Sequence, residues 1–144
     1  MTQEDKNLLL KDLCARLPYG VIVYYNNGDV IEDREMGLGS VHDFMFDNVE
    51  VKPYLRPMLD MTEEEEKYIN KEFDFYIKLP TWKGDITIIN LRPYGIGSHL
   101  STTVDNLKLT KIIDWLNAHH FDYRGLIKKG FAIAVTKENN PYKE

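Results

Sequence analysis

Residues 51–79 read V-K-P-Y-L-R-P-M-L-D-M-T-E-E-E-E-K-Y-I-N-K-E-F-D-F-Y-I-K-L, and they contain the sharpest change of structural period in the chain. Pro53 and Pro57 fix their own φ near about −65° and keep the residues before them out of the helical region. Thr62 and Glu65 then match a capping box, and four glutamates fill the first turn of the helix that follows, where the helix dipole favours negative charge. We therefore predict a border at Thr62, with strands and turns before it and mostly helix after it.

The chain before this stretch begins with a predicted helix over residues 2–17. Thr2 is placed as a cap, Pro18 ends the helix, and four leucines recur at helical spacing to form one apolar stripe. These leucines are Leu9, Leu10, Leu13 and Leu17. Cys14 lies between apolar neighbours, so we expect a small core or boundary side chain rather than a nucleophile.

A hairpin is predicted after this helix. Residues 19–25 are rich in β-branched and aromatic side chains, and Asn26-Asn27-Gly28 follows; Asn-Gly favours a type I′ turn. The return strand, 29–36, is heavily acidic, which indicates an exposed edge. Residues 41–51 are interpreted as one or two further strands. Together these strands predict a small, bent antiparallel sheet, with an SH3-like half-barrel as the best match to the strand count.

Helices dominate the predicted second half. We expect helices over residues 63–79 and 104–119, a short helix capped by Asp122 and ended by Gly130, and strands at 86–89 and 131–136. Residues 92–103 are interpreted as a loop. The fold class is thus α+β, as a single domain of residues 1–144. It has a β-rich part at 1–61, a mainly helical part at 62–137 and a frayed tail at 138–144.

Composition and charge limit the possible functions. The lone cysteine allows no intramolecular disulfide, residues 1–7 do not resemble a signal peptide, and no apolar run approaches the roughly 20 residues that span a bilayer. We therefore expect a cytoplasmic protein that does not enter a membrane. The formal net charge is −5. Residues 83–137 are locally basic, so nucleic-acid binding there is a weaker alternative, which the acidic chain as a whole disfavours.

Two groups of residues are candidate sites. Lys52, Tyr54 and Arg56 alternate along an extended segment and can share one face, and Tyr and Arg are enriched in binding hot spots. His119 and His120, with Asp122, offer ligands for zinc or iron. Adjacent histidines on a helix point about 100° apart, however, so they suit a helix end better than a metal site.

No cofactor is expected from the sequence. Gly95-Ile96-Gly97 lacks both the third glycine of a dinucleotide loop and the Gly-Lys-Ser/Thr pattern of a phosphate loop. The Gly97-Ser98-His99 run lacks the flanking glycines of a nucleophile elbow.

Two stretches resemble a group of uncharacterised proteins of gut bacteria and their phages. They are K-P-Y-L-R-P-M at 52–58 leading into M-T-E-E-E at 61–65, and D-W-L-N-A-H-H-F-D-Y-R-G-L-I at 114–127. The resemblance implies no activity; it implies a phage- or prophage-encoded accessory protein, and it suggests that the two stretches are neighbours in the fold.

The leading hypothesis is a non-enzymatic accessory protein that binds another macromolecule, namely a protein. Its predicted surface is Lys52, Tyr54 and Arg56 together with Tyr123 and Arg124. The alternative is a metal-dependent enzyme that uses the histidine pair and Asp122. Homo-oligomer formation is left open.

Overall fold

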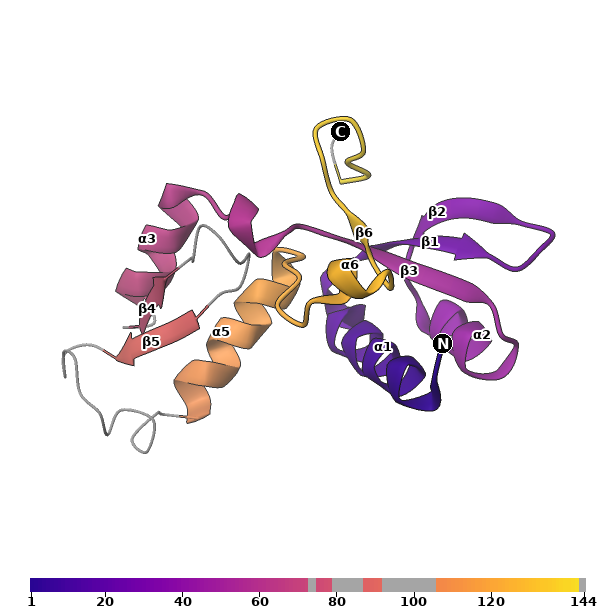
Figure 1. Cartoon of the computed structure of the whole chain (residues 1–144), viewed down its shortest axis with the longest axis horizontal. Helices are drawn as coiled ribbons and strands as arrows, with labels where there is room; N and C mark the ends of the chain where they lie inside the picture. Colours follow the sequence, from indigo (N-terminus) through magenta and orange to yellow (C-terminus); the bar gives the residue numbers. More distant parts are fainter. Residues whose placement is uncertain (73–74, 79–86, 92–105, 143–144) are drawn as a thin grey trace. The chain divides into compact units, whose positions relative to one another are not determined.

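The computed structural model describes residues 1–72, 75–78, 87–91 and 106–142 (Figure 1). The chain divides into two compact units. Met1–Arg56 and Asn117–Glu144 build the first unit, and Pro57–Leu116 forms the second. The second unit is therefore an insertion between the two segments of the first. The expected α+β class, with an N-terminal helix, a small sheet and further helices, is confirmed. Folding as a single domain stays a prediction.

A four-stranded sheet organises the first unit, in the order β2-β1-β3-β6. Its strands are β1 (Ile22–Asn26), β2 (Ile31–Glu35), β3 (Glu50–Leu55) and β6 (Ile133–Ala134). β2, β1 and β3 are antiparallel neighbours, as expected, but β6 lies parallel to β3. The sheet is thus mixed rather than purely antiparallel. A parallel partner needs a long crossover, and the inserted unit together with the chain after it supplies one.

The predicted hairpin joins β1 to β2, and Asn26 pairs with Ile31 at its end. The turn differs in type from the one expected. Asn27 N donates to Val30 O at 3.1 Å, and Gly28 has a φ of 95°, whereas Asn27 does not have a positive φ. A single positive φ at the first central position of the turn is typical of type II′ rather than type I′. β2 lies at the sheet edge and is mostly exposed, as its acidic sequence predicted.

α1 (Gln3–Arg16) covers one face of this sheet (Figure 1). Thr2 and Asp5 form the capping box that begins the helix. Leu9 and Leu13 are buried in the core, whereas Leu10 and Leu17 are half-buried against it, so the predicted stripe is confirmed. A short 3-10 turn, η1 (Leu17–Tyr19), follows the helix.

Cys14 is exposed, so the expectation of a core or boundary side chain is wrong. It follows the buried Leu13 directly in α1, and neighbouring positions of a helix point about 100° apart. Apolar neighbours in the sequence therefore do not imply that Cys14 lies on the buried face of the helix.

α2 (Leu38–Phe46) replaces the strands expected in the first part of residues 41–51. Val41 and Phe44 are three positions apart and both enter the core, which is helical rather than strand spacing. Gly37 precedes the helix in an extended conformation, and Gly39 lies within its first turn. With a helix at this position, the β-rich part does not build an SH3-like half-barrel.

The second unit contains η2 (Met58–Asp60), α3 (Glu63–Glu72), β4 (Phe75–Lys78), β5 (Thr87–Leu91) and nearly all of α5 (Asn106–Ala118). The predicted capping box is present: Glu65 N donates to Thr62 Oγ1 and Thr62 N donates to Glu65 Oε1, both at 3.1 Å. The strand predicted at 86–89 is confirmed as β5, and the helix at 104–119 as α5. The loop predicted at 92–103 lies outside the described residues.

The helix predicted over residues 63–79 is too long. It ends at Glu72, and β4 then pairs antiparallel with β5. The sequence F-Y-I-K of β4 is rich in aromatic and β-branched residues, which pack well in strands. Pairing with the next strand along the chain therefore overrides the continued helical spacing.

The first unit is completed by α6 (Leu126–Lys129), β6 and the chain to Tyr142. Gly130 ends α6 with a φ of 81°, as the sequence predicted. The final strand, predicted over residues 131–136, is limited to the two residues of β6. The tail is held rather than frayed at Tyr142, whose ring stacks on His120 with centroids 4.1 Å apart. No helix in the described part of the chain is long and apolar enough to cross a membrane.

Candidate functional site

Arg56 and the segment from His120 to Asp122 meet beside the sheet. Arg56, at the end of β3, forms a parallel bridge with Phe121. Arg56 N donates to His120 O at 2.7 Å, and Asp122 N donates to Arg56 O at 2.9 Å. The stretches 52–65 and 114–127 are therefore neighbours at these residues, as expected. The bridge also joins the chain leaving the first unit to the chain returning to it.

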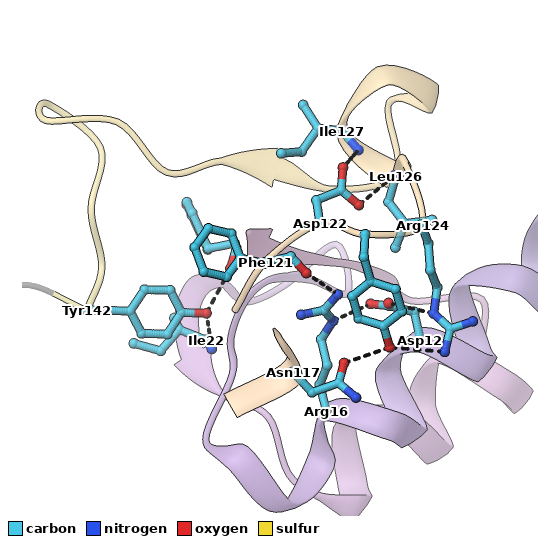
Figure 2. A network of polar contacts seen from close by, with 12 residues as sticks. Asp12, Arg16, Ile22, Asn117, Phe121, Asp122, Arg124, Leu126, Ile127 and Tyr142 are labelled. Carbon is cyan, nitrogen blue, oxygen red and sulfur yellow. Dashed lines mark hydrogen bonds and ion pairs between the residues drawn. The ribbon is translucent and has the colours of Figure 1, made fainter. Parts of the chain in front are cut away.

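A buried polar network fixes α1 to the returning segment (Figure 2). Asp12 and Arg16 are both fully buried, and Arg16 Nε donates to Asp12 Oδ2 at 2.8 Å. The second oxygen of Asp12 accepts from Arg124 Nε at 3.1 Å, and Arg16 Nη2 donates to Phe121 O at 2.7 Å. One carboxylate therefore sits between two guanidinium groups. Removing a partner from such a buried group is costly, so the network serves the structure of this unit.

Tyr123 extends the network. Its hydroxyl donates to Asn117 Oδ1 at 2.8 Å and accepts from Arg124 Nη2 at 3.2 Å. The guanidinium of Arg16 lies 5.3 Å from the centre of its ring. Tyr123 and Arg124 were predicted to bind a partner, but their polar ends are engaged inside this unit. Only the remaining surface of these side chains is available to another molecule.

The other predicted contact residues lie on β3 and at its end. Tyr54 is only 5% exposed, and its hydroxyl donates to Asp33 Oδ1 at 2.8 Å. Burial, followed by this hydrogen bond, raises the pKa of Tyr54 to about 12. The guanidinium of Arg56 lies 4.1 Å from the centre of the Phe121 ring. Lys52 Nζ lies 3.7 Å from Glu50 Oε1 and is partly exposed.

Of the residues of the alternative metal site, Asp122 and His120 make contacts within the first unit. Asp122 accepts from Leu126 N at 2.8 Å through Oδ1 and from Ile127 N at 2.9 Å through Oδ2 (Figure 2). It thus caps α6, as the sequence predicted. Burial, with Arg16 as the next cause, lowers the pKa of His120 to about 4. His119 is half-buried next to it.

Within the described ranges, a different group of three potential metal ligands comes together. The ligand atoms of His42, Asp43 and Asp47 lie within 4.8 Å of one another at the end of α2. His42 and Asp47 are exposed, and Asp43 Oδ2 accepts a hydrogen bond from the Tyr25 hydroxyl at 2.7 Å. Exposed groups of this kind are common without a metal, and the Asp43 carboxylate is already used to hold α2 against β1.

The outward side of α2 is apolar. Leu38 is 75% exposed, Met45 39% and Phe46 68%. With His42, whose ring lies 4.9 Å from that of Phe46, these residues follow helical spacing along one face. We call these four residues the α2 face. Sequence reasoning missed it because the segment was interpreted as strand. The available signal was the spacing of Leu38, His42, Met45 and Phe46.

The weaker nucleic-acid alternative concerns residues 83–137, of which the structure describes 87–91 and 106–137. The basic residues Lys83 and Arg92 lie outside the described part, so this alternative stays a prediction.

Comparisons with protein-family models, curated proteins and solved structures give no match to this chain.

Proposed function

We propose that this chain is a cytoplasmic, non-enzymatic accessory protein of the phage or prophage type that binds another protein through the α2 face. The main support is the exposure of Leu38 and Phe46, at 75% and 68%, on a helix whose opposite side is packed in a core. Large apolar side chains that gather on one exposed face typically mark an interaction site. The phage type is supported by the resemblance of residues 52–65 and 114–127 alone.

The helix that carries this face is well anchored. Val41 and Phe44 are buried in the core, and Asp43 accepts a hydrogen bond from the Tyr25 hydroxyl of β1. A rigid helix that presents apolar side chains loses little conformational entropy when it binds, because its backbone is already ordered. The α2 face therefore has the properties of a preformed binding surface.

Charge around this face defines the partner that it fits. Asp43 and Asp47 lie at the carboxyl end of α2, where the helix dipole is also negative. A partner that places aliphatic or aromatic side chains on the α2 face and Lys or Arg beside these carboxylates would satisfy both features. We therefore propose a partner with an apolar patch or groove bordered by basic residues.

Affinity capture tests the proposal. The double variant Leu38→Glu/Phe46→Glu places charge on the α2 face, whereas Ile31→Glu alters an apolar residue of β2 that is 63% exposed. We expect the wild type and the Ile31 variant to capture the same basic partner, and the α2 variant to lose it. Because these sites are exposed, each substitution should change the free energy of unfolding by less than about 0.5 kcal/mol.

Two results would argue against this function. Equal capture by all three proteins would show that the α2 face is not the interface. A partner without a basic surface would contradict the charge argument, even if the α2 variant lost it.

A further inference from the structure

One side of the β2 backbone has no partner strand. β2 is the end strand in the order β2-β1-β3-β6, and among the described residues β1 is the only strand that pairs with it. Two backbone hydrogen bonds bound this pairing, from Asn27 N to Val30 O at 3.1 Å and from Met36 N to Val21 O at 2.9 Å. The residue pairs at both ends of the β1–β2 ladder are therefore hydrogen-bonded pairs.

The positions between these two ends show which backbone groups point outward. Hydrogen-bonded and non-hydrogen-bonded pairs alternate along an antiparallel ladder. Counting by two positions from either end, the backbone groups of Glu32 and Arg34 point towards β1. Those of Ile31, Asp33 and Glu35 point away from it. These three residues therefore offer their N–H and C=O groups to an added strand.

The side chains of β2 are acidic and mostly exposed. Its sequence, I-E-D-R-E, has three carboxylates and one guanidinium group. This guanidinium is engaged, because Arg34 forms an ion pair with Glu32 and lies 3.8 Å from the centre of the Tyr25 ring. Two copies of this strand would bring like charges together, which destabilises strand pairs. The charge therefore favours a basic strand as the occupant of this edge.

The three outward-pointing residues also share one face of the sheet, because alternate side chains of a strand point to the same face. Ile31 is 63% exposed, so this face offers one apolar side chain followed by two carboxylates. Asp33 Oδ1 accepts a hydrogen bond from the Tyr54 hydroxyl at 2.8 Å, which holds the first carboxylate in place. A matching segment has one apolar residue and two cations at alternate positions.

We propose that the outer edge of β2 binds an extended, basic segment of another protein, which adds a fifth strand to the sheet. Its backbone pairs with Ile31, Asp33 and Glu35, and its Lys or Arg side chains lie opposite the two carboxylates. In strand addition, main-chain hydrogen bonds give affinity and alternate side chains give specificity. The site uses the backbone of β2 and not the α2 face, so this proposal is independent of the proposed function.

The peptide Lys-Thr-Lys-Thr-Val, blocked at both ends, is a suitable probe. In antiparallel pairing it places its lysines opposite Glu35 and Asp33 and its valine opposite Ile31. It is titrated into the full chain while amide NMR signals and hydrogen exchange are followed. We expect saturable binding with slower exchange of the Ile31, Asp33 and Glu35 amides, and little change at Glu32 and Arg34, which are already bonded to β1. Slower exchange confined to other amides would overturn the proposal.

A modified peptide separates strand addition from simple charge attraction. N-methylation of its second lysine and its valine keeps both charges but removes two backbone donors that face β2. We expect this peptide to bind at least about tenfold more weakly, the scale of one to two lost backbone hydrogen bonds. Equal binding of the two peptides would overturn the proposal.

Two double variants test the charge pairing. Asp33→Asn/Glu35→Gln should weaken binding of the unmodified peptide by about fivefold, the scale of two exposed ion pairs. The asparagine oxygen can still accept from the Tyr54 hydroxyl. Glu63→Gln/Glu64→Gln removes the same charge from exposed residues of α3 and should leave the affinity unchanged. An equal loss in both variants, or no loss in the first, would overturn the proposal.

The α2 variant keeps this proposal distinct from the proposed function. Leu38→Glu/Phe46→Glu leaves the backbone and the carboxylates of β2 unchanged, so it should bind the peptide as the wild type does. Loss of peptide binding in this variant would place the peptide on the α2 face and overturn the β2 site.

Discussion

Tyr142 connects two strands that would otherwise part. The pairing of β1 with β3 ends at Val23 and Pro53. Beyond this point, Ile22 N donates to the Tyr142 hydroxyl at 3.0 Å (Figure 2). The hydroxyl in turn donates to Tyr54 O at 2.8 Å. A side chain from the end of the chain therefore takes the place of a missing bond of the sheet ladder.

Tyr142→Phe removes this bridge and keeps the ring that stacks on His120. It leaves Ile22 N and Tyr54 O without their partner, so we expect the free energy of unfolding to fall by about 1–3 kcal/mol in denaturant titration. Tyr24→Phe is the control, because the Tyr24 hydroxyl has a single, long hydrogen bond within the described part of the chain, accepted from the Asn26 side chain at 3.3 Å. Its effect should stay within about 0.5 kcal/mol.

The wild type and Tyr142→Phe also provide a test at different pH values. Burial raises the pKa of Tyr142 to about 12, whereas an unfolded tyrosine titrates near about 10. The unfolded chain therefore loses its proton first, so this contribution is fully present below pH 10 and is lost as the pH rises towards 12. The advantage of the wild type over Tyr142→Phe should shrink across this interval. A constant difference would mean that the hydroxyl is not buried as described.

Residue roles that depend on neighbours in sequence were predictable, and those that depend on distant residues were not. Thr2 with Asp5 and Thr62 with Glu65 act within one helical turn, so their capping boxes follow from the sequence. Tyr142 acts on strands more than eighty positions away, and no local pattern reports such a contact. The contact between Asp12 and Arg124 could not be predicted for the same reason, because the two residues are far apart in the sequence.

At the scale of elements, glycines have opposite effects at the two ends of helices. Gly130 ends α6 with a φ of 81°, and the amides at its end bond back to Ile127 O and Leu126 O. Gly39 lies in the first turn of α2 without a positive φ, and a Cβ added there meets no atom within 4 Å. The conformation at Gly130 thus requires a glycine, whereas Gly39 only adds conformational freedom to the unfolded chain.

Alanine substitutions should therefore change stability in opposite directions. Gly130→Ala forces an L-residue into the left-handed region, and we expect a loss of about 1–2 kcal/mol in thermal or denaturant unfolding. Gly39→Ala should raise the free energy of unfolding by about 0.5 kcal/mol. A loss in Gly39→Ala would indicate that α2 does not begin where the structure places it.

The errors in element prediction share a cause. Strands are predicted from the sequence over residues 41–51, although the spacing of Val41 and Phe44 is helical. The run F-Y-I-K at 75–78 could extend a helix by its spacing, but it forms a strand because β5 offers a partner. Short apolar runs fit both periods, and packing and pairing in the fold decide between them. Because of the first of these errors, the α2 face was not predicted from the sequence.

At the scale of the whole molecule, the first unit is built from both ends of the chain. Among the described residues, its core is formed by side chains from Met1–Arg56 and Asn117–Glu144, and the Arg56–Phe121 bridge closes the point where the second unit is inserted. Residues 52–56 and 117–127 lie on the two sides of this point, and the bridge takes one residue from each.

This arrangement predicts that the first unit folds without the insertion. Replacing residues 57–116 with a flexible Gly/Ser linker, which can span a short gap, should leave a protein that unfolds in one cooperative transition, with the amides of β1 and β3 protected from exchange. The same shortened chain with Val23→Asp buries a charge at a fully buried core position and should lose that transition. If the shortened chain that keeps Val23 unfolded gradually and without cooperativity, the core of the first unit would depend on the inserted unit.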